Sequence, residues 1–426
     1  PGAPMPQARG VFHCGGGRME QRMAGPVAEG ERIAVLDMLR GFALFGIFLI
    51  NVEWFARPQQ DMIAGVGPGE GLDGRVGALV YLLVQGKFWV LFSLLFGMGF
   101  ALMHQRAQAA GRPFIGLYLR RSLLLALFGL AHIAFVWTGD VLFTYALASL
   151  GLLAFLPVRG PALWLAGLGL YVAVPLLSLF GGLALGLLPA SALAPVQEDM
   201  RALAAAGQAA AAVYREGDFL AVSAQRWAEY FGWIFPQATL YHLPMALGCF
   251  LIGAWLLRSG RLADLSAQRG FFLALAIGGG LAGGALLALG ASLGLRFDPV
   301  AEFPRASLAS GLMMLGNLPL SLAYLALFLL LASLPGPRRL LGLLAPAGRM
   351  ALTNYLAQTL LCSLVFYGYG LGVFDAMGRT AQLGFVVLVF TAQLVFSHAW
   401  LARFRFGPLE WLWRAGTYLR LPPLRR

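Results

Sequence analysis

Two charged side chains stand near the start of an apolar segment that is long enough to enter a bilayer. Asp37 and Arg40 are three residues apart, so a helix places them on one face, where they can neutralise each other. A charged side chain inside a membrane costs about 2.5–3.5 kcal/mol on insertion scales, so this pair predicts a polar interior. Asn51 follows Arg40 by about 16 Å along a helix, which puts it near the bilayer midplane. We expect all three to line an entrance and a cavity.

A histidine and a carboxylate form the candidate catalytic pair. His132 ends the third apolar segment, and Asp140 lies in the short turn that follows Trp137. A carboxylate that orients an imidazole makes it a general base, so the two residues can move a proton together. Two alternatives stay open: Asp140 can cap the next helix, and a single histidine in a membrane helix can serve as a hydrogen-bonded packing residue.

Further polar side chains interrupt apolar segments. Glu53 closes the first segment, and the stretch 85–87, which ends on Lys87, breaks the second. Irregular backbone at membrane depth is tolerated where it is buried in protein or faces a cavity, so this break belongs inside a helical bundle. His242 stands two residues before Pro244, which predicts a kink, and its catalytic role has less support than that of His132.

The ninth apolar segment carries a polar stripe. Asn354 and Gln358 are four residues apart and share a helix face that must contact protein or water, while Arg349 and Tyr355 belong to the same stretch. Hydrogen bonds between helices are the alternative explanation. The candidate substrate-binding or cavity-lining residues are Asp37, Arg40, Asn51, Glu53, Lys87, Arg349, Asn354, Tyr355 and Gln358.

The composition places the chain in the membrane class. Hydrophobic residues make up 59% of the 426 residues and charged residues 12%. The net charge of +12 comes from arginines in short tracts between apolar segments, which is the distribution of cytoplasmic loops and argues against nucleic-acid binding. The three cysteines form no C-x-x-C pair, so neither a disulfide framework nor a metal site is predicted.

The apolar runs predict an all-α, polytopic membrane protein with about ten transmembrane helices and both termini in the cytoplasm. The expected spans are 34–56, 76–103, 114–136, 141–158, 161–188, 235–257, 270–295, 307–333, 347–369 and 381–402. The bilayer is therefore the first partner of the chain.

The chain divides into five expected regions. They are a disordered segment at 1–31, a five-helix membrane region at 32–189, an outer amphipathic insertion at 190–233, a second five-helix membrane region at 234–402, and a cytoplasmic aromatic helix with its tail at 403–426. The last helix has tryptophans suited to the membrane interface and a spacing of Glu410 and Arg414 that suits an ion pair.

Five separated motifs occur in order between Arg32 and Tyr418. They are Arg32-x4-Asp37-x2-Arg40-Gly41, Lys87-Phe88 with Phe92-Ser93-x2-Phe96-Gly97, Trp137-x-Gly139-Asp140-x-Leu142-x2-Tyr145-Ala146, Gly348-Arg349-Met350-x-Leu352-Thr353-Asn354-Tyr355-x2-Gln358, and Phe404-x-Phe406-Gly407-Pro408-Leu409-Glu410-Trp411-x-Trp413-Arg414-x2-Thr417-Tyr418. With these motifs the chain resembles the YeiB-like proteins of the bacterial inner membrane, a family described as a domain of unknown function. The resemblance implies a multi-pass protein of that membrane.

The first helix is also similar to that of membrane acetyltransferases of the heparan-glucosaminide type, which share an L-D-x-x-R-G-like start and an asparagine matching Asn51. This similarity implies transfer of an acyl group from a cytoplasmic thioester, with acyl-CoA as the candidate donor; the residues indicate no other cofactor. In those enzymes the catalytic histidine soon follows that asparagine, whereas no histidine occurs here between Cys14 and Met103. His132 would therefore have to substitute for it from another helix.

Three functions remain open on the sequence. The first is a membrane acyl or acetyl transferase that uses His132 and Asp140. The second is a transporter or exporter of a small or lipid-linked solute, with a midplane site built from Lys87, Glu53 and the polar stripe of the ninth segment. The third is a non-catalytic scaffold or sensor. The sequence specifies neither the substrate nor the oligomeric state.

Overall fold

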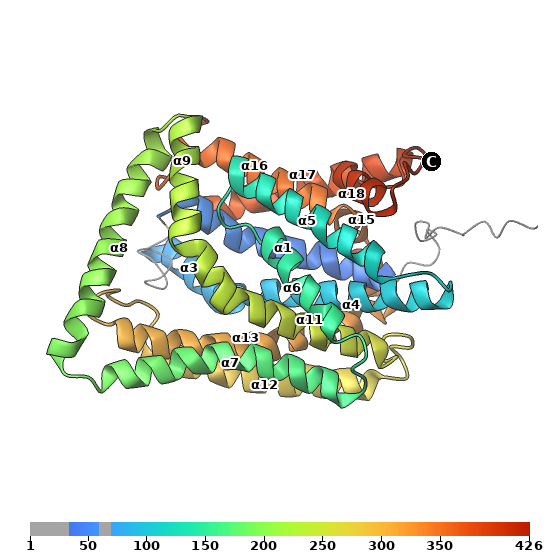
Figure 1. Ribbon diagram of the computed structural model, residues 1–426, viewed down its shortest axis with the longest axis horizontal. Helices are drawn as coiled ribbons and strands as arrows, with labels where there is room; N and C mark the ends of the chain where they lie inside the picture. The colour runs from blue at the N-terminus through green and yellow to red at the C-terminus, as the bar shows by residue number, and fades with distance from the viewer. Residues whose placement is uncertain (1–33, 59–69) are drawn as a thin grey trace, which may run out of the picture.

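The computed structural model describes residues 34–58 and 70–426, and the expected disorder of residues 1–31 lies outside them. The regular secondary structure of the described parts is helical, apart from an isolated bridge between Phe404 and Arg425 (Figure 1). The helices are α1 Ala34–Ala56, α3 Gly71–Leu83, α4 Lys87–Ala109, α5 Ile115–Phe135, α6 Leu142–Ala154, α7 Pro161–Gly186, α8 Ala190–Glu216, α9 Phe219–Glu229, α10 Phe235–Gln237, α11 Leu243–Arg258, α12 Arg269–Leu293, α13 Phe303–Ala332, α14 Pro335–Gly342, α15 Ala345–Arg349, α16 Ala351–Phe366, α17 Arg379–Arg403 and α18 Pro408–Tyr418, with π-helical turns η2 Tyr230–Ile234 and η3 Ala238–His242.

The all-α membrane architecture expected from the sequence is confirmed. Eight helical segments in the described ranges are long and apolar enough to cross a bilayer: Ala34–Ala56, Gly71–Ala109, Ile115–Phe135, Pro161–Gly186, Phe219–Arg258, Arg269–Leu293, Phe303–Ala332 and Arg379–Arg403. The two other expected spans correspond to α6 and α16, which have 13 and 16 residues. Both are shorter than the roughly 20 residues of a full crossing.

The second span is broken as its sequence predicts. Helix α3 ends at Leu83, and α4 begins at Lys87 after Gly86, whose φ of 79° favours glycine. Two hydroxyl groups of α13 donate hydrogen bonds to backbone carbonyls at the break. Tyr324 Oη donates to the Leu83 carbonyl at 3.0 Å, and Ser321 Oγ donates to the Lys87 carbonyl at 2.8 Å. The break is thus satisfied inside the bundle.

Glycines set how closely the helices approach. A Cβ on Gly97 of α4 would collide with the backbone of Phe250 in α11, so these two helices pack with almost no side chain between them. Gly279 and Gly283 likewise face the backbone of α13, as the small-residue spacing in α12 predicts. Gly280, one residue away, has no heavy atom within 4 Å of its would-be Cβ and lies on the outer surface.

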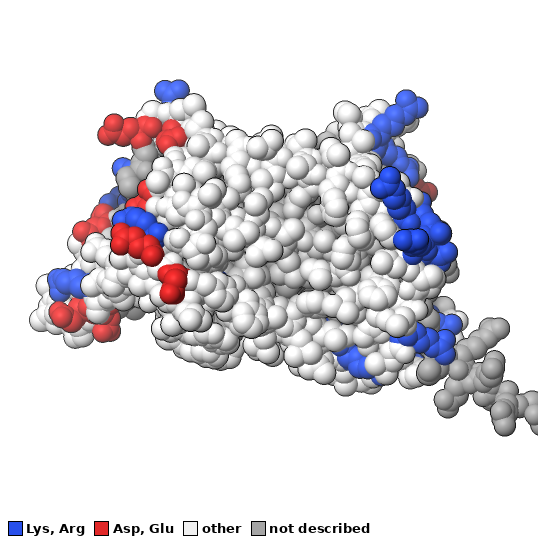
Figure 2. All heavy atoms as spheres, turned by 90° about the horizontal axis from the view of Figure 1, so that it is seen from above, with Lys and Arg blue, Asp and Glu red and all other residues white. Residues whose placement is uncertain are grey.

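The two ends of the bundle differ in charge. The crosswise helix α8 and the start of α9 cover one end, and α18 lies at the other (Figure 1). Acidic side chains gather around α8 and α9, basic side chains dominate at the α18 end, and an uncharged belt separates them (Figure 2). We call these the acidic end and the basic end.

We expect Gly97→Ala to lower the stability of the protein because the added methyl group has no room against α11. Overpacking of this kind costs about 1–3 kcal/mol, which a fall in the melting temperature of the detergent-solubilised protein reports. Gly280→Ala is the matched control and should leave the melting temperature equal or slightly higher, because its site is open and alanine favours the helix. Equal effects of both substitutions would contradict the packing described here.

Candidate functional site

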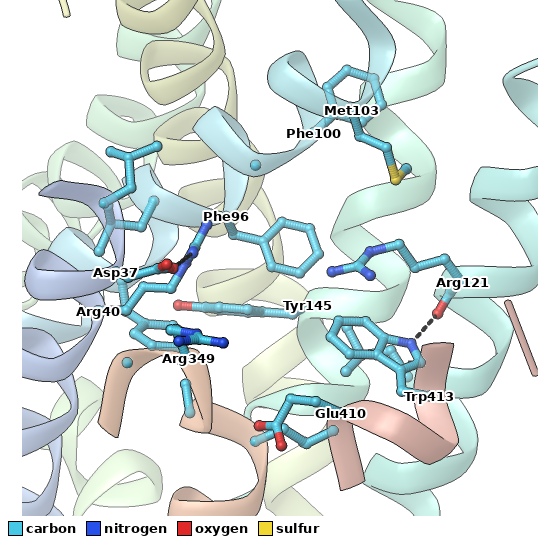
Figure 3. Close-up of a pocket in the computed structure, with 18 of the residues that line it drawn as sticks. Asp37, Arg40, Phe96, Phe100, Met103, Arg121, Tyr145, Arg349, Glu410 and Trp413 are labelled. Carbon is cyan, nitrogen blue, oxygen red and sulfur yellow. Dashed lines mark hydrogen bonds and ion pairs between the residues drawn. The ribbon is translucent and has the colours of Figure 1, made fainter. Parts of the chain in front are cut away.

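A cavity of about 310 Å³ lies at the basic end. Its wall combines side chains from α1, α4, α5, α6, α15, α16 and α18, so residues far apart in the sequence meet there (Figure 3). The inner part is apolar and aromatic, with Ile47, Leu95 and Leu125 among its lining residues. The volume is within the roughly 300–1,000 Å³ of small-molecule sites in proteins.

Asp37 and Arg40 form part of this wall, as expected. Their ion pair joins Arg40 Nη1 to Asp37 Oδ1 at 2.5 Å, and Asp37 is 6% exposed. The backbone of α1 is held there by α15, because Gly348 lets its chain approach the Asp37 carbonyl. The first turns of α1 thereby present a fixed ion pair to the cavity.

Guanidinium groups are the main polar feature of the wall. The arginines that line the cavity are Arg40, Arg106, Arg121, Arg349 and Arg414, against the two carboxylates of Asp37 and Glu410. The Arg121 guanidinium lies 3.6 Å from the ring centre of Trp413, and that of Arg414 lies 4.6 Å from the ring centre of Phe406. Among the described residues neither Arg121 nor Arg414 has a salt bridge to a carboxylate, so both can bind an anion that enters the cavity.

Helix α18 is docked onto the bundle and completes this wall. Glu410 accepts hydrogen bonds from the Thr353 backbone N–H at 3.0 Å and from Thr353 Oγ1 at 2.6 Å. Burial raises the pKa of Glu410, and these two bonds partly oppose that shift. Trp413 Nε1 donates to the Arg121 carbonyl at 3.0 Å. The ion pair expected between Glu410 and Arg414 is absent, because Thr353 binds the carboxylate and Phe406 underlies the guanidinium.

A tyrosine and a serine lie at the inner wall. Tyr145 of α6 lines the cavity and is 1% exposed. Its hydroxyl lies 2.5 Å from Ser93 Oγ and donates to the Trp89 carbonyl at 3.2 Å, both on α4. Nothing in the local sequence signals this pair, since Ser93 and Tyr145 are 52 residues apart.

His132 and Asp140 form the predicted pair, outside the cavity lining. His132 Nδ1 lies 2.8 Å from Asp140 Oδ2, and both side chains are fully buried. The second ring nitrogen lies 2.8 Å from Thr359 Oγ1, and Asp140 Oδ1 accepts the Phe143 N–H at 2.7 Å, which caps α6 as the sequence also predicts. The ring of Tyr355, which does line the cavity, is 5.5 Å from that of His132 and separates it from the open space.

The polar stripe of α16 bonds to α17 instead of lining the cavity. Asn354 Nδ2 donates to Ser397 Oγ at 3.0 Å, and Gln358 Nε2 donates to Gln393 Oε1 at 2.8 Å. Gln393 in turn donates to the Asn354 carbonyl at 3.0 Å. These side-chain amides form hydrogen bonds between the two helices, which was the alternative explanation of this stripe.

The remaining candidates are spread through the bundle. Arg349 lines the cavity, whereas Asn51, Glu53 and Lys87 do not. Glu53 is 5% exposed and accepts from Arg379 Nε at 2.9 Å near the acidic end, with Arg57 as a second partner. Lys87 is 1% exposed at the start of α4, and Asn51 is half-buried in α1. The predicted site residues therefore do not converge on one place.

In the described residues, no group of three His, Cys, Asp or Glu side chains is arranged to hold a metal ion, and Cys249 and Cys362 are buried free thiols. The arrangement at the basic end can instead hold an anion with an apolar part. Guanidinium groups suit phosphate or carboxylate oxygens, and the inner wall suits hydrocarbon.

The helices and the cavity define the class of the protein: an all-helical membrane protein with a basic cavity opening near one end. Comparison with known proteins places it more closely. Residues 256–420 match the family described as "Protein of unknown function (DUF418)". The chain belongs to this family, whose YeiB-like members its motifs resemble.

The relatives cover almost the whole chain. The uncharacterized protein YxaH of Bacillus subtilis is 30% identical over 94% of this chain and 98% of its own length. The uncharacterized protein YeiB of Escherichia coli is 33% identical over 91% of this chain and 96% of its own length. An uncharacterized 39.9 kDa protein of Bacillus acidopullulyticus is 31% identical over 94% of this chain. No solved structure matches the chain significantly.

We expect Asp140→Ala to destabilise the protein, because it leaves the buried His132 ring and the Phe143 N–H without their partner. A buried donor left without an acceptor costs about 1–3 kcal/mol, so the loss should show clearly in the melting temperature. Thr359→Ser keeps the hydroxyl at the other ring nitrogen and should change the melting temperature little. An Asp140→Ala protein as stable as the wild type would contradict a structural role for this carboxylate.

Proposed function

We propose that this protein is a membrane-embedded acyl or acetyl transferase that takes its acyl group from acyl-CoA bound in the basic cavity. The observation that carries the proposal is the group of five guanidinium groups in the wall of a largely apolar cavity, with Arg121 and Arg414 held on aromatic rings. The similarity of the first helix to membrane acetyltransferases supports the same conclusion.

The charge distribution supports an orientation. Cytoplasmic loops of membrane proteins carry an excess of Lys and Arg, so we assign the basic end to the cytoplasm and the acidic end to the outer side of the bacterial inner membrane (Figure 2). The cavity then opens toward the compartment in which acyl-CoA is found. No further cofactor enters this proposal.

The cavity wall matches the two parts of such a donor. Phosphate groups would bind to Arg121, Arg349 and Arg414, since charge-assisted hydrogen bonds to anions are among the strongest in proteins. The thioester arm would extend along the apolar wall toward Tyr145. The Asp37–Arg40 pair would shape the entrance.

His132 and Asp140 are the proposed base and its orienting carboxylate. The acceptor hydroxyl or amine would give its proton to His132 while it attacks the thioester carbonyl, and the proton would then pass to the departing thiolate. In the structure Thr359 occupies the second ring nitrogen and Tyr355 separates the ring from the cavity. Catalysis by His132 therefore requires these two side chains to move.

A transporter or exporter of a small or lipid-linked solute is the second candidate. The broken span at Gly86 and the buried Lys87 favour it, because discontinuous helices in transporters form substrate sites near the midplane. Solute flux in vesicles with no covalent product in mass spectra would favour transport over transfer. A scaffold or sensor that presents α18 to a partner requires neither flux nor transfer.

We expect CoA to raise the melting temperature of the purified protein in detergent, because a ligand that binds the folded state stabilises it. Arg121→Gln and Arg414→Gln should each weaken this effect at least tenfold, since a hydrogen bond to a charged group contributes about 1.5–3 kcal/mol. Arg338→Gln is the matched control, because Arg338 is exposed on α14 and does not line the cavity. No response of the wild type to millimolar CoA would refute the proposal.

We further expect His132→Ala to abolish transfer of radiolabelled acetyl groups from acetyl-CoA into membrane or soluble acceptors, while CoA still raises the melting temperature. His132→Ala protein that retains full transfer would exclude His132 as the base without affecting the assignment of the cavity.

A further inference from the structure

The helical segment from Phe219 to Arg258 is continuous but contains two wide turns. The π-helical turns η2 and η3 interrupt it, and each ends two residues before a proline. Pro236 and Pro244 have no N–H to donate to the carbonyls of residues four positions earlier, which is the physical reason for the irregular turns. Wide turns of this kind often occur at functional sites because they redirect side chains.

The second wide turn ends on His242, whose side chain is exposed although it belongs to a membrane-spanning segment. No hydrogen-bond partner of its ring is present among the described residues. Leu240 in the same turn is 68% exposed, and residues two positions apart on a helix point about half a turn apart. Because the apolar Leu240 suits lipid, His242 points to the opposite side, toward the other helices.

Trp89 of α4 is the neighbour of His242 on that side. The two rings meet edge to face with centroids 5.9 Å apart, and Trp89 is half-buried. The Trp89 carbonyl accepts the hydroxyls of Ser93 at 2.9 Å and Tyr145 at 3.2 Å. The rings of Trp89 and Tyr145 are 6.4 Å apart, and Tyr145 lines the basic cavity, so these two side chains connect His242 to the cavity wall.

The depth of His242 places it near the acidic end. Arg258 ends the same helix at the basic end, 16 positions away, which corresponds to about 24 Å at 1.5 Å per residue. The hydrocarbon core is about 30 Å thick, so His242 lies in the outer third of the membrane. An unpaired imidazole at this depth is costly unless it meets water or a ligand.

We infer that His242 and Trp89 form an acceptor site, reached from the acidic end, for a hydroxyl-bearing molecule that receives the acyl group. This inference rests on the proposed transferase function and adds the second substrate to it. The imidazole accepts a hydrogen bond from a hydroxyl of the acceptor other than the attacking one, whose proton goes to His132, and the indole covers one side of the bound molecule. Tyr145 and Ser93 lie between the two substrates in this structure, so these side chains must move before the attacking hydroxyl reaches the thioester carbonyl.

Access from the acidic end is tested by cysteine labelling in spheroplasts that produce the full-length chain. A charged, membrane-impermeant methanethiosulfonate reagent should label His242→Cys at least tenfold faster than Leu240→Cys, which points to lipid. The wild-type chain gives the background labelling of its own cysteines, Cys14, Cys249 and Cys362, of which the last two are buried. Labelling of His242→Cys no faster than of Leu240→Cys would overturn the inference.

The acceptor role is tested in the purified protein with acetyl-CoA as donor and glycerol as the hydroxyl probe. His242→Ala should raise the KM for glycerol at least tenfold and leave the KM for acetyl-CoA unchanged, and His242→Gln, which keeps a hydrogen-bond acceptor, should restore part of the loss. A changed KM for acetyl-CoA alone, or no change in either KM, would overturn the assignment of His242.

The two proposals fail in distinguishable ways. If CoA does not stabilise the wild type, the transferase proposal fails, and the inference that rests on it fails with it. If CoA stabilises the wild type but no acetylglycerol forms, the acceptor assignment is wrong while the donor cavity stands. Equal CoA stabilisation of wild type and His242→Ala, together with equal size-exclusion profiles, shows that the variant is folded.

Discussion

The need to pair polar groups inside an apolar layer governs this structure. Several buried charges and amides in the described residues have a partner within the bundle: Asp37 with Arg40, Glu53 with Arg379, and Gln358 with Gln393. These pairs fix which helix faces meet, and close glycine contacts such as that of Gly97 then set how near the backbones come. Charge pairing is incomplete in the cavity, because its arginines outnumber its carboxylates.

Local features of the fold and the site could be predicted from the sequence. The spacing of Asp37 and Arg40 gives their contact, and the short turn that separates His132 from Asp140 brings these two side chains together. The interruption at Gly86 follows from glycine between two apolar runs. In each case the residues concerned are near each other in the sequence, so the local geometry of a helix or turn determines the outcome.

Contacts across the bundle could not be predicted in this way. Arg121 and Trp413 are 292 residues apart, and no local pattern shows that α18 folds back to complete the cavity. Asn354 and Gln358 had the residue types of a binding site, but they form hydrogen bonds to α17 and do not line the cavity. A buried polar residue signals that some partner exists; which partner depends on the packing of helices that a single sequence does not specify.

The two short helices bear on the membrane itself. Helices α6 and α16, of 13 and 16 residues, measure about 20 and 24 Å along their axes, against a hydrocarbon core of about 30 Å. A hydrophobic length below the bilayer thickness is accommodated by local thinning of the bilayer or by interfacial anchors, at a modest cost for each ångström of mismatch. Because α6 and α16 both line the cavity, a bilayer that thins to match these two helices would shorten the distance between its leaflets at the cavity.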